Sequence, residues 1–81
     1  MTEKECIVNE IRRINEVIER TKAGLSVLTK ANPNLLYSDE LRDRYLKTLQ
    51  GLDDLITTRD LYERLLFVKY RTIVIDNREF E

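Results

Sequence analysis

The chain contains no histidine and no tryptophan, and only one cysteine, one proline and two glycines among its 81 residues. A single cysteine, Cys6, cannot form an internal disulfide, and without histidine no zinc site of the Cys/His type can be assembled. The absence of histidine also removes the most frequent base of nucleophilic catalysis. Small domains without disulfides or metals are commonly stabilised by oligomerisation. We therefore expect this chain to form a homo-oligomer, most simply a dimer.

Long apolar runs and an excess of one charge are missing as well. Residues 1–5 carry no apolar segment of a secretion signal, and no run approaches the roughly 18 apolar residues that span a membrane. Fourteen Lys and Arg residues are interleaved with 15 Asp and Glu residues, for a net charge of −1. Such a balance gives no broad attraction to nucleic acid or to an anionic membrane. We expect a cytoplasmic protein whose partners are neither nucleic acid nor membrane.

The first part of the chain has the pattern of one long helix over residues 2–31. Thr2 and Glu5 match a capping box, in which each side chain satisfies a free backbone donor of the other. Behind it runs a stripe with alternating spacings of four and three: Ile7, Ile11, Ile14, Ile18, Thr21, Leu25 and Leu28. This heptad-like spacing is typical of a helix that packs against another helix. Pro33 then ends the helix and predicts a turn over residues 32–37.

A second helix is predicted over residues 39–70, with Ser38 as its N-cap. Its apolar stripe consists of Leu41, Tyr45, Leu49, Leu52 and Ile56. Thr57 and Asp60 match another capping box, so the segment is either one helix or two helices broken near residue 57. We favour one helix, because neither proline nor glycine stands at that junction. The predicted fold is an all-α antiparallel helical hairpin in a single domain, completing a four-helix bundle by oligomerisation.

The C-terminal segment changes character abruptly, because residues 72–75 are all β-branched and favour extended structure. Asp76 and Asn77 have the composition of a turn, and residues 78–81 that of a polar end. An isolated strand is not stable alone. We expect an extended arm over residues 72–76 that pairs with a symmetry mate or a partner's sheet edge, or that packs as an arm.

No group of residues predicts a catalytic, cofactor or metal site. Cys6 stands beside Glu3 and Glu5, whose charges disfavour a thiolate, and is expected to be inert. The one polar anomaly is Arg59, which falls on the inward stripe of the second helix. Together with Tyr62 and Thr21, Arg59 could line an anion or ligand site, since arginine is a strong phosphate ligand. The structural alternative is that Arg59 extends to solvent or pairs with Glu63.

The last part of the second helix is apolar around most of its circumference, so one neighbouring helix cannot bury all of its apolar side chains. The predicted protein interface comprises Leu61, Tyr62, Leu65, Leu66, Phe67, Val68, Tyr70, Ile73 and Ile75. Either a homodimer buries this surface in the centre of a four-helix bundle, or a monomer presents it to another protein.

These features favour a small oligomeric protein-interaction module that binds and regulates or inhibits another macromolecule, and not an enzyme. On base rates alone, such proteins are frequent among phage and mobile-element accessory proteins. The alternative is a helical bundle that binds a small ligand or nucleotide through Arg59. A third hypothesis is a small subunit of a larger complex.

Overall fold

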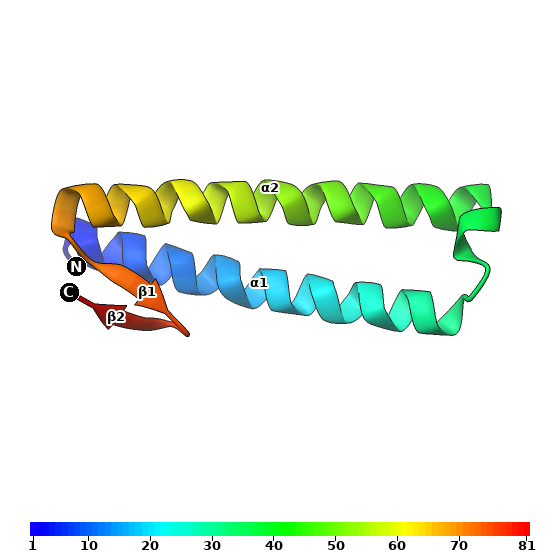
Figure 1. Ribbon diagram of the computed structural model, residues 1–81, viewed down its shortest axis with the longest axis horizontal. Coiled ribbons are helices and arrows are strands. Elements are labelled where there is room, and N and C mark those ends of the chain that lie inside the picture. The colour runs from blue at the N-terminus through cyan, green and yellow to red at the C-terminus, as the bar shows by residue number, and fades with distance from the viewer.

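The computed structural model describes all 81 residues apart from the side chain of Leu36. Two long helices, α1 (Glu3–Ala31) and α2 (Asp39–Tyr70), run antiparallel and are joined through a short 3-10 helix, η1 (Leu35–Tyr37). A β-hairpin of β1 (Ile73–Ile75) and β2 (Arg78–Phe80) follows. The molecule measures 48 × 18 × 17 Å, and both termini lie at the end opposite the α1–α2 connection (Figure 1). The predicted all-α helical hairpin is confirmed.

The helices begin where their capping residues predict. The Thr2 hydroxyl accepts a hydrogen bond of 3.2 Å from the Glu5 backbone N–H, and the Ser38 hydroxyl accepts one of 3.4 Å from the Leu41 N–H. These oxygens satisfy backbone donors that have no partner within the first helical turn. The predicted continuity of the second helix is also confirmed, because α2 passes through residues 57–60 without a break.

The C-terminal arm is not a lone strand, because the chain supplies its own partner. β1 pairs antiparallel with β2, with Ile73 opposite Phe80. Asp76 and Asn77 form the connecting turn that their composition predicts, with φ angles of 52° and 63°. Two consecutive positive φ angles are typical of the type I′ turn, whose twist suits a two-residue β-hairpin. β1 therefore has a partner within its own chain and does not need a strand of another chain, and residues 78–81, which we expected to be a polar end, contain the second strand.

The β-hairpin lies against the helices near the termini. The Arg12 Nε donates a hydrogen bond of 2.9 Å to the Asn77 carbonyl oxygen, and the Asn15 Nδ2 donates one of 3.1 Å to Asn77 Oδ1. Val74 packs against the core, and Thr72 is completely buried, with its hydroxyl donating to a backbone carbonyl. The β-hairpin therefore forms a third layer over one end of the helix pair (Figure 1).

Two ion pairs connect segments of the chain at this end of the molecule. Lys4 Nζ lies 2.6 Å from Glu81 Oε1, and Lys69 Nζ lies 2.6 Å from Glu3 Oε1. The hydrogen bond from Lys69 lowers the pKa of Glu3, and that from Lys4 lowers the pKa of Glu81. The same contacts raise the pKa values of Lys4 and Lys69. These pairs are exposed, so they position the chain ends more than they stabilise the fold.

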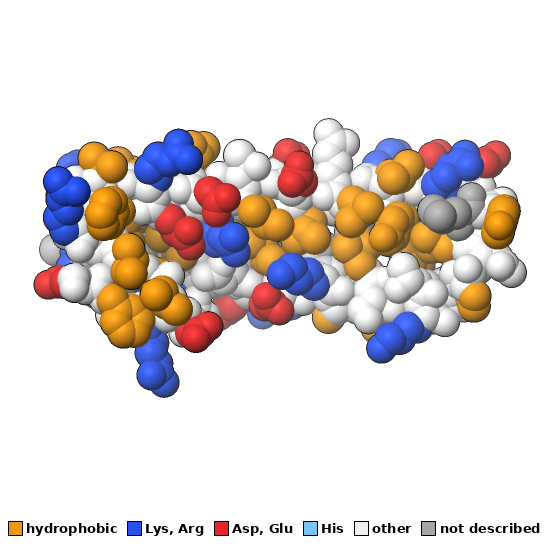
Figure 2. All heavy atoms as spheres, viewed as in Figure 1, with side chains coloured by type: hydrophobic (Ala, Val, Ile, Leu, Met, Phe, Trp, Pro, Cys, Tyr) orange, Lys and Arg blue, Asp and Glu red, His pale blue; other side chains and the backbone are white. Residues whose placement is uncertain are grey.

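The apolar core is unevenly distributed along the helical hairpin. Buried side chains concentrate at the end where the termini lie, which we call the terminal end: Ile7, Val8, Ile11, Ile14, Ile18 and Leu66. Toward the α1–α2 connection, the loop end, the only described apolar side chain that is fully buried is Leu35. The stripe residues of that half remain half-buried: Leu25, Leu28, Leu41, Tyr45, Leu49, Leu52 and Ile56. Figure 2 shows apolar atoms exposed along the groove between the two helices in that half.

Candidate interaction surfaces

One apolar surface lies on the side of α2 that faces away from α1. Leu61, Leu65 and Val68 are 58%, 43% and 66% exposed. Their spacing of four and three residues places them on one helix face, whereas the fully buried Leu66 points toward α1. We call these three exposed residues the outer patch. Because α2 has α1 on its other side, the helical hairpin itself cannot cover the outer patch.

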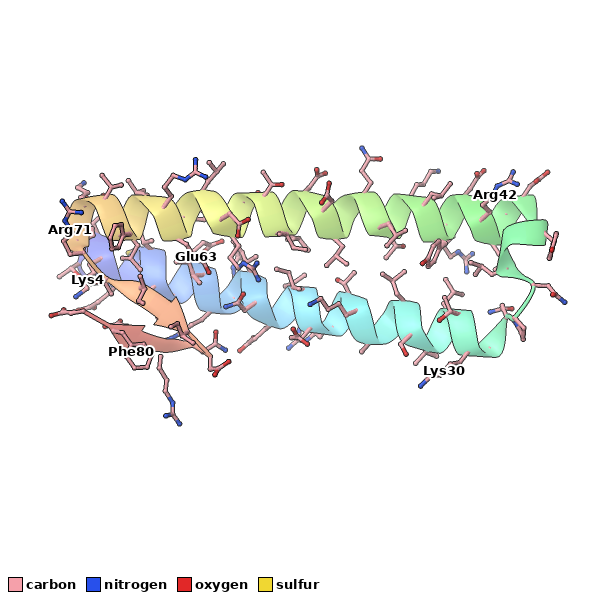
Figure 3. The ribbon with its side chains drawn as sticks, in the orientation of Figure 1. Lys4, Lys30, Arg42, Glu63, Arg71 and Phe80 are labelled. Carbon is pink, nitrogen blue, oxygen red and sulfur yellow. The ribbon has the colours of Figure 1, made fainter. Side chains whose placement is uncertain are left out.

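A second apolar surface, the hairpin patch, consists of Ile73, Ile75 and Phe80. Val74 faces the core, so its neighbours on β1 face outward, and the register places Phe80 beside Ile73 on that face. All three are exposed, and Phe80 lies at the outer edge of the molecule in Figure 3. The sequence signal that could have found Phe80 is its position opposite Ile73 across a two-residue turn.

The structure divides the interface predicted from the sequence. Leu66 is fully buried in the core of the monomer, and Tyr62 and Tyr70 pack partly buried against the same core. Six of the predicted residues are exposed: Leu61, Leu65, Phe67, Val68, Ile73 and Ile75. The available surface at the terminal end is thus the outer patch and the hairpin patch, with Phe67 beside Arg71, whose guanidinium carbon lies 5.4 Å from the ring centre.

A third surface is the uncovered groove between the helices at the loop end. Leu49, Leu52 and Ile56 line a shallow hollow of about 480 Å³ there, together with Gln50 and Asp53. Tyr45 borders a smaller hollow of about 210 Å³, which Leu35 also lines. We call the α2 side of this groove, from Leu41 to Ile56, the open seam.

Arg59 is held by neighbours of its own chain. Its side chain is 27% exposed, and its Nε lies 3.7 Å from Glu63 Oε1. The Nη1 donates to Asn15 Oδ1 over 3.3 Å, and the Nη2 donates to Asp60 Oδ1 over 3.4 Å. This matches the structural alternative, pairing with Glu63. The Nε atom itself is buried and forms no hydrogen bond within the described residues.

The three residues considered for an anion site do not share one pocket. Arg59 lines a hollow of about 490 Å³ whose wall includes the carboxylates of Glu19, Glu63 and Asp76. Tyr62 lines a separate hollow, and the Thr21 hydroxyl donates to a backbone carbonyl of its own helix over 2.8 Å. An anion beside Arg59 would face three negative charges, so the arrangement favours a structural role for this arginine.

Among the described side chains, no group of three or more metal-binding residues is placed to hold an ion. No helix among the described elements has both the length and the apolar character that a membrane crossing requires. No protein-family model, curated protein or solved structure matches the chain.

Proposed function

We propose that this chain is a small, self-associating, cytoplasmic interaction module that binds another protein and regulates or inhibits it, without catalysing a reaction itself. The observation that carries this proposal is the outer patch. Leu61, Leu65 and Val68 form an apolar stripe on a helix face that the monomer leaves in water. The single cysteine, Cys6, is exposed and unpaired, which suits a reducing compartment.

The outer patch has the spacing with which helices bind protein grooves. An amphipathic helix that docks in an apolar groove presents anchors at positions i, i+3 or i+4, and i+7. Leu61, Leu65 and Val68 occupy i, i+4 and i+7 on a helix that is already folded. Burying these half-exposed side chains contributes about 1 kcal/mol each. Because α2 is rigid before it binds, little of that gain is spent on ordering the helix.

The experiment compares a patch variant with a control variant on the same helix. Leu61→Glu/Leu65→Glu removes two anchors, and Thr57→Glu adds a charge at an exposed position without removing an apolar side chain. Proteins captured from an extract of the native cells are identified, and the binding of each candidate is then measured by calorimetry. We expect the patch variant to bind the partner at least about tenfold more weakly, and the control variant to bind as the wild type does.

Circular dichroism serves as the control, and both variants should keep the helical content of the wild type. Addition of the wild-type protein should change the activity of the identified partner, and addition of the patch variant should not. A partner that binds the patch variant as tightly as the wild type would contradict the proposal.

A further inference from the structure

The accessible surface is larger than a compact monomer of this mass would expose. The chain exposes 6116 Å² at a mass of 9.7 kDa, whereas the scaling for folded monomers gives about 5,100 Å². The difference, about 1,000 Å², is comparable with the roughly 800 Å² that each partner buries in a standard interface. One additional copy packed along the groove is enough to account for this excess.

The β-hairpin shows which part of the groove needs cover. At the terminal end it packs over the helix pair and stops at Asn77, which contacts Asn15 in the middle of α1. Beyond that point the open seam continues toward the loop end without a covering layer (Figures 1 and 2). Its stripe from Leu41 to Ile56 spans roughly 22 Å of helix. The side chains are half-buried and not solvated outright, as is typical of a layer that lacks its last neighbour.

Two opposite charges flank the open seam, one on each side of its centre. Arg42 and Asp53 lie 11 positions apart, about three helical turns, and therefore on the same side of α2. The midpoint between them falls between residues 47 and 48, and the midpoint of the stripe between residues 48 and 49. Asp53 lines the same hollow as Leu49 and Ile56, and Arg42 projects from the loop end of α2 in Figure 3.

We propose that a second copy of this chain occupies the open seam, with the two α2 helices antiparallel and crossing near residue 48. A two-fold axis at that point covers each stripe with its own copy and brings each Arg42 beside Asp53 of the other copy. An isologous contact of this kind requires a self-complementary surface, which opposite charges on the two sides of the axis provide. The β-hairpins then lie at the two far ends and limit the overlap to the loop halves.

Both charges are able to form the new pair. Arg42 donates to Asp39 over 2.8 Å and keeps further guanidinium donors free. Asp53 forms no ion pair among the described side chains. This inference rests on the self-association in the proposed function. It differs from the bundle predicted from the sequence, because it leaves the outer patch free for the partner protein.

The test is a charge exchange followed by sedimentation equilibrium over a range of concentrations. Arg42→Asp and Asp53→Arg should each raise the dimer dissociation constant roughly tenfold or more, because the two-fold axis repeats each repulsion twice. The double variant Arg42→Asp/Asp53→Arg should return to within about threefold of the wild type. Single variants that dimerise normally, or a double variant as weak as the singles, would overturn the pairing.

Cross-linking supplies the second measurement, in a Cys6→Ser background. Leu49→Cys, beside the proposed axis, should form a disulfide-linked dimer on mild oxidation, whereas Leu61→Cys in the outer patch should not. Cross-linking through Leu61→Cys alone would overturn this inference and leave self-association intact. A protein that is monomeric at all concentrations would overturn the inference together with the self-association in the proposed function, while partner binding by the outer patch stays separately measurable.

Discussion

The side chains of Asn15 and Asn77 are joined by a hydrogen bond of 3.1 Å across 62 positions of sequence. Asn77 also forms the second residue of the β-turn, at a φ of 63°. Asn77 thus contributes both to the conformation of the turn and to its hydrogen bond with the middle of α1. The attachment of the β-hairpin therefore depends on a backbone conformation that most residues adopt only with strain.

Replacing Asn77 separates these two contributions. Asn77→Ala should lower the free energy of unfolding by about 1–2 kcal/mol, because alanine is strained at this φ and cannot accept the hydrogen bond. Asn77→Gly loses the same bond but adopts the turn freely, so it should cost less. Urea unfolding followed by circular dichroism measures both values. Equal losses for the two variants would show that the backbone conformation contributes nothing.

Arg71 offers a second test of backbone strain. It caps α2 in the left-handed region, with φ 54° and ψ 35°, and its N–H donates to the Phe67 carbonyl over 2.8 Å. Glycine is the usual residue at this position of a helix end. Arg71→Gly and Arg71→Ala both remove the contact with the Phe67 ring, so their difference isolates the backbone. We expect the glycine variant to be about 1 kcal/mol more stable in thermal unfolding, and no difference would contradict the strain.

Adjacent leucines on α2 should respond very differently to truncation. Leu66 is fully buried and Leu65 is 43% exposed. Leu66→Ala should therefore lower the free energy of unfolding by about 2–5 kcal/mol, which approaches the whole stability of a domain of this size. Leu65→Ala should cost less than about 1 kcal/mol. Urea unfolding at low protein concentration measures the decrease in the free energy of unfolding for each variant. Similar decreases for the two variants would mean that Leu65 is also buried in solution.

Removing the charge of Arg59 should not weaken the fold. The Nε is buried and makes no hydrogen bond among the described residues, and the partners Asp60 and Glu63 remain in contact with water when the arginine is replaced, so no charge is left buried and unpaired. We expect Arg59→Leu to melt at the same temperature as the wild type or higher. Inorganic phosphate should not raise the melting temperature of either protein beyond the general effect of salt. A phosphate-dependent rise in the wild type that Arg59→Leu abolishes would instead support an anion site.

The ion pairs at the terminal end predict a defined pH dependence. The pKa values of Glu3 and Glu81 are lowered from 4.5, so their contribution to stability is present above that pH and is lost as the pH falls through their folded pKa values. The pKa values of Lys4 and Lys69 are raised from 10.5, so their contribution is complete below that pH and is lost on further rise. Carboxyl titration by NMR should show the Glu81 pKa returning toward 4.5 in Lys4→Met, with Glu3 unchanged as the internal control.

Local sequence signals were sufficient for the helices. Thr2 and Ser38 cap the helix starts as predicted, and Pro33 follows the end of α1. The lack of proline and glycine around Thr57 correctly favoured one long helix. Each of these signals depends only on residues that are close in sequence, so it can be recognised without knowledge of the fold. The second strand was missed because Phe80 stands among charged residues, and its pairing with Ile73 depends on the turn geometry.

The uneven core could not be predicted in the same way. The apolar spacing of α1 is the same at Ile11 and at Leu25, yet Ile11 is fully buried and Leu25 only half-buried. The difference arises because the β-hairpin adds a third layer at one end only. The sequence analysis also grouped Leu66 with the exposed leucines. A continuous apolar segment does not reveal which of its members faces the neighbouring helix.

The concentration of the core at the terminal end reverses the usual gradient of local stability. In most small domains the first and last residues exchange their amide hydrogens fastest. Here the buried cluster that includes Ile7, Val8 and Leu66 lies beside the β-hairpin, close to both termini. The middle of the sequence, near Leu35, has the fewest buried side chains around it. Opening of the monomer should therefore begin at the connection and travel toward the termini, and a protease should cut first where the two helices join. A bound second copy would protect that same region.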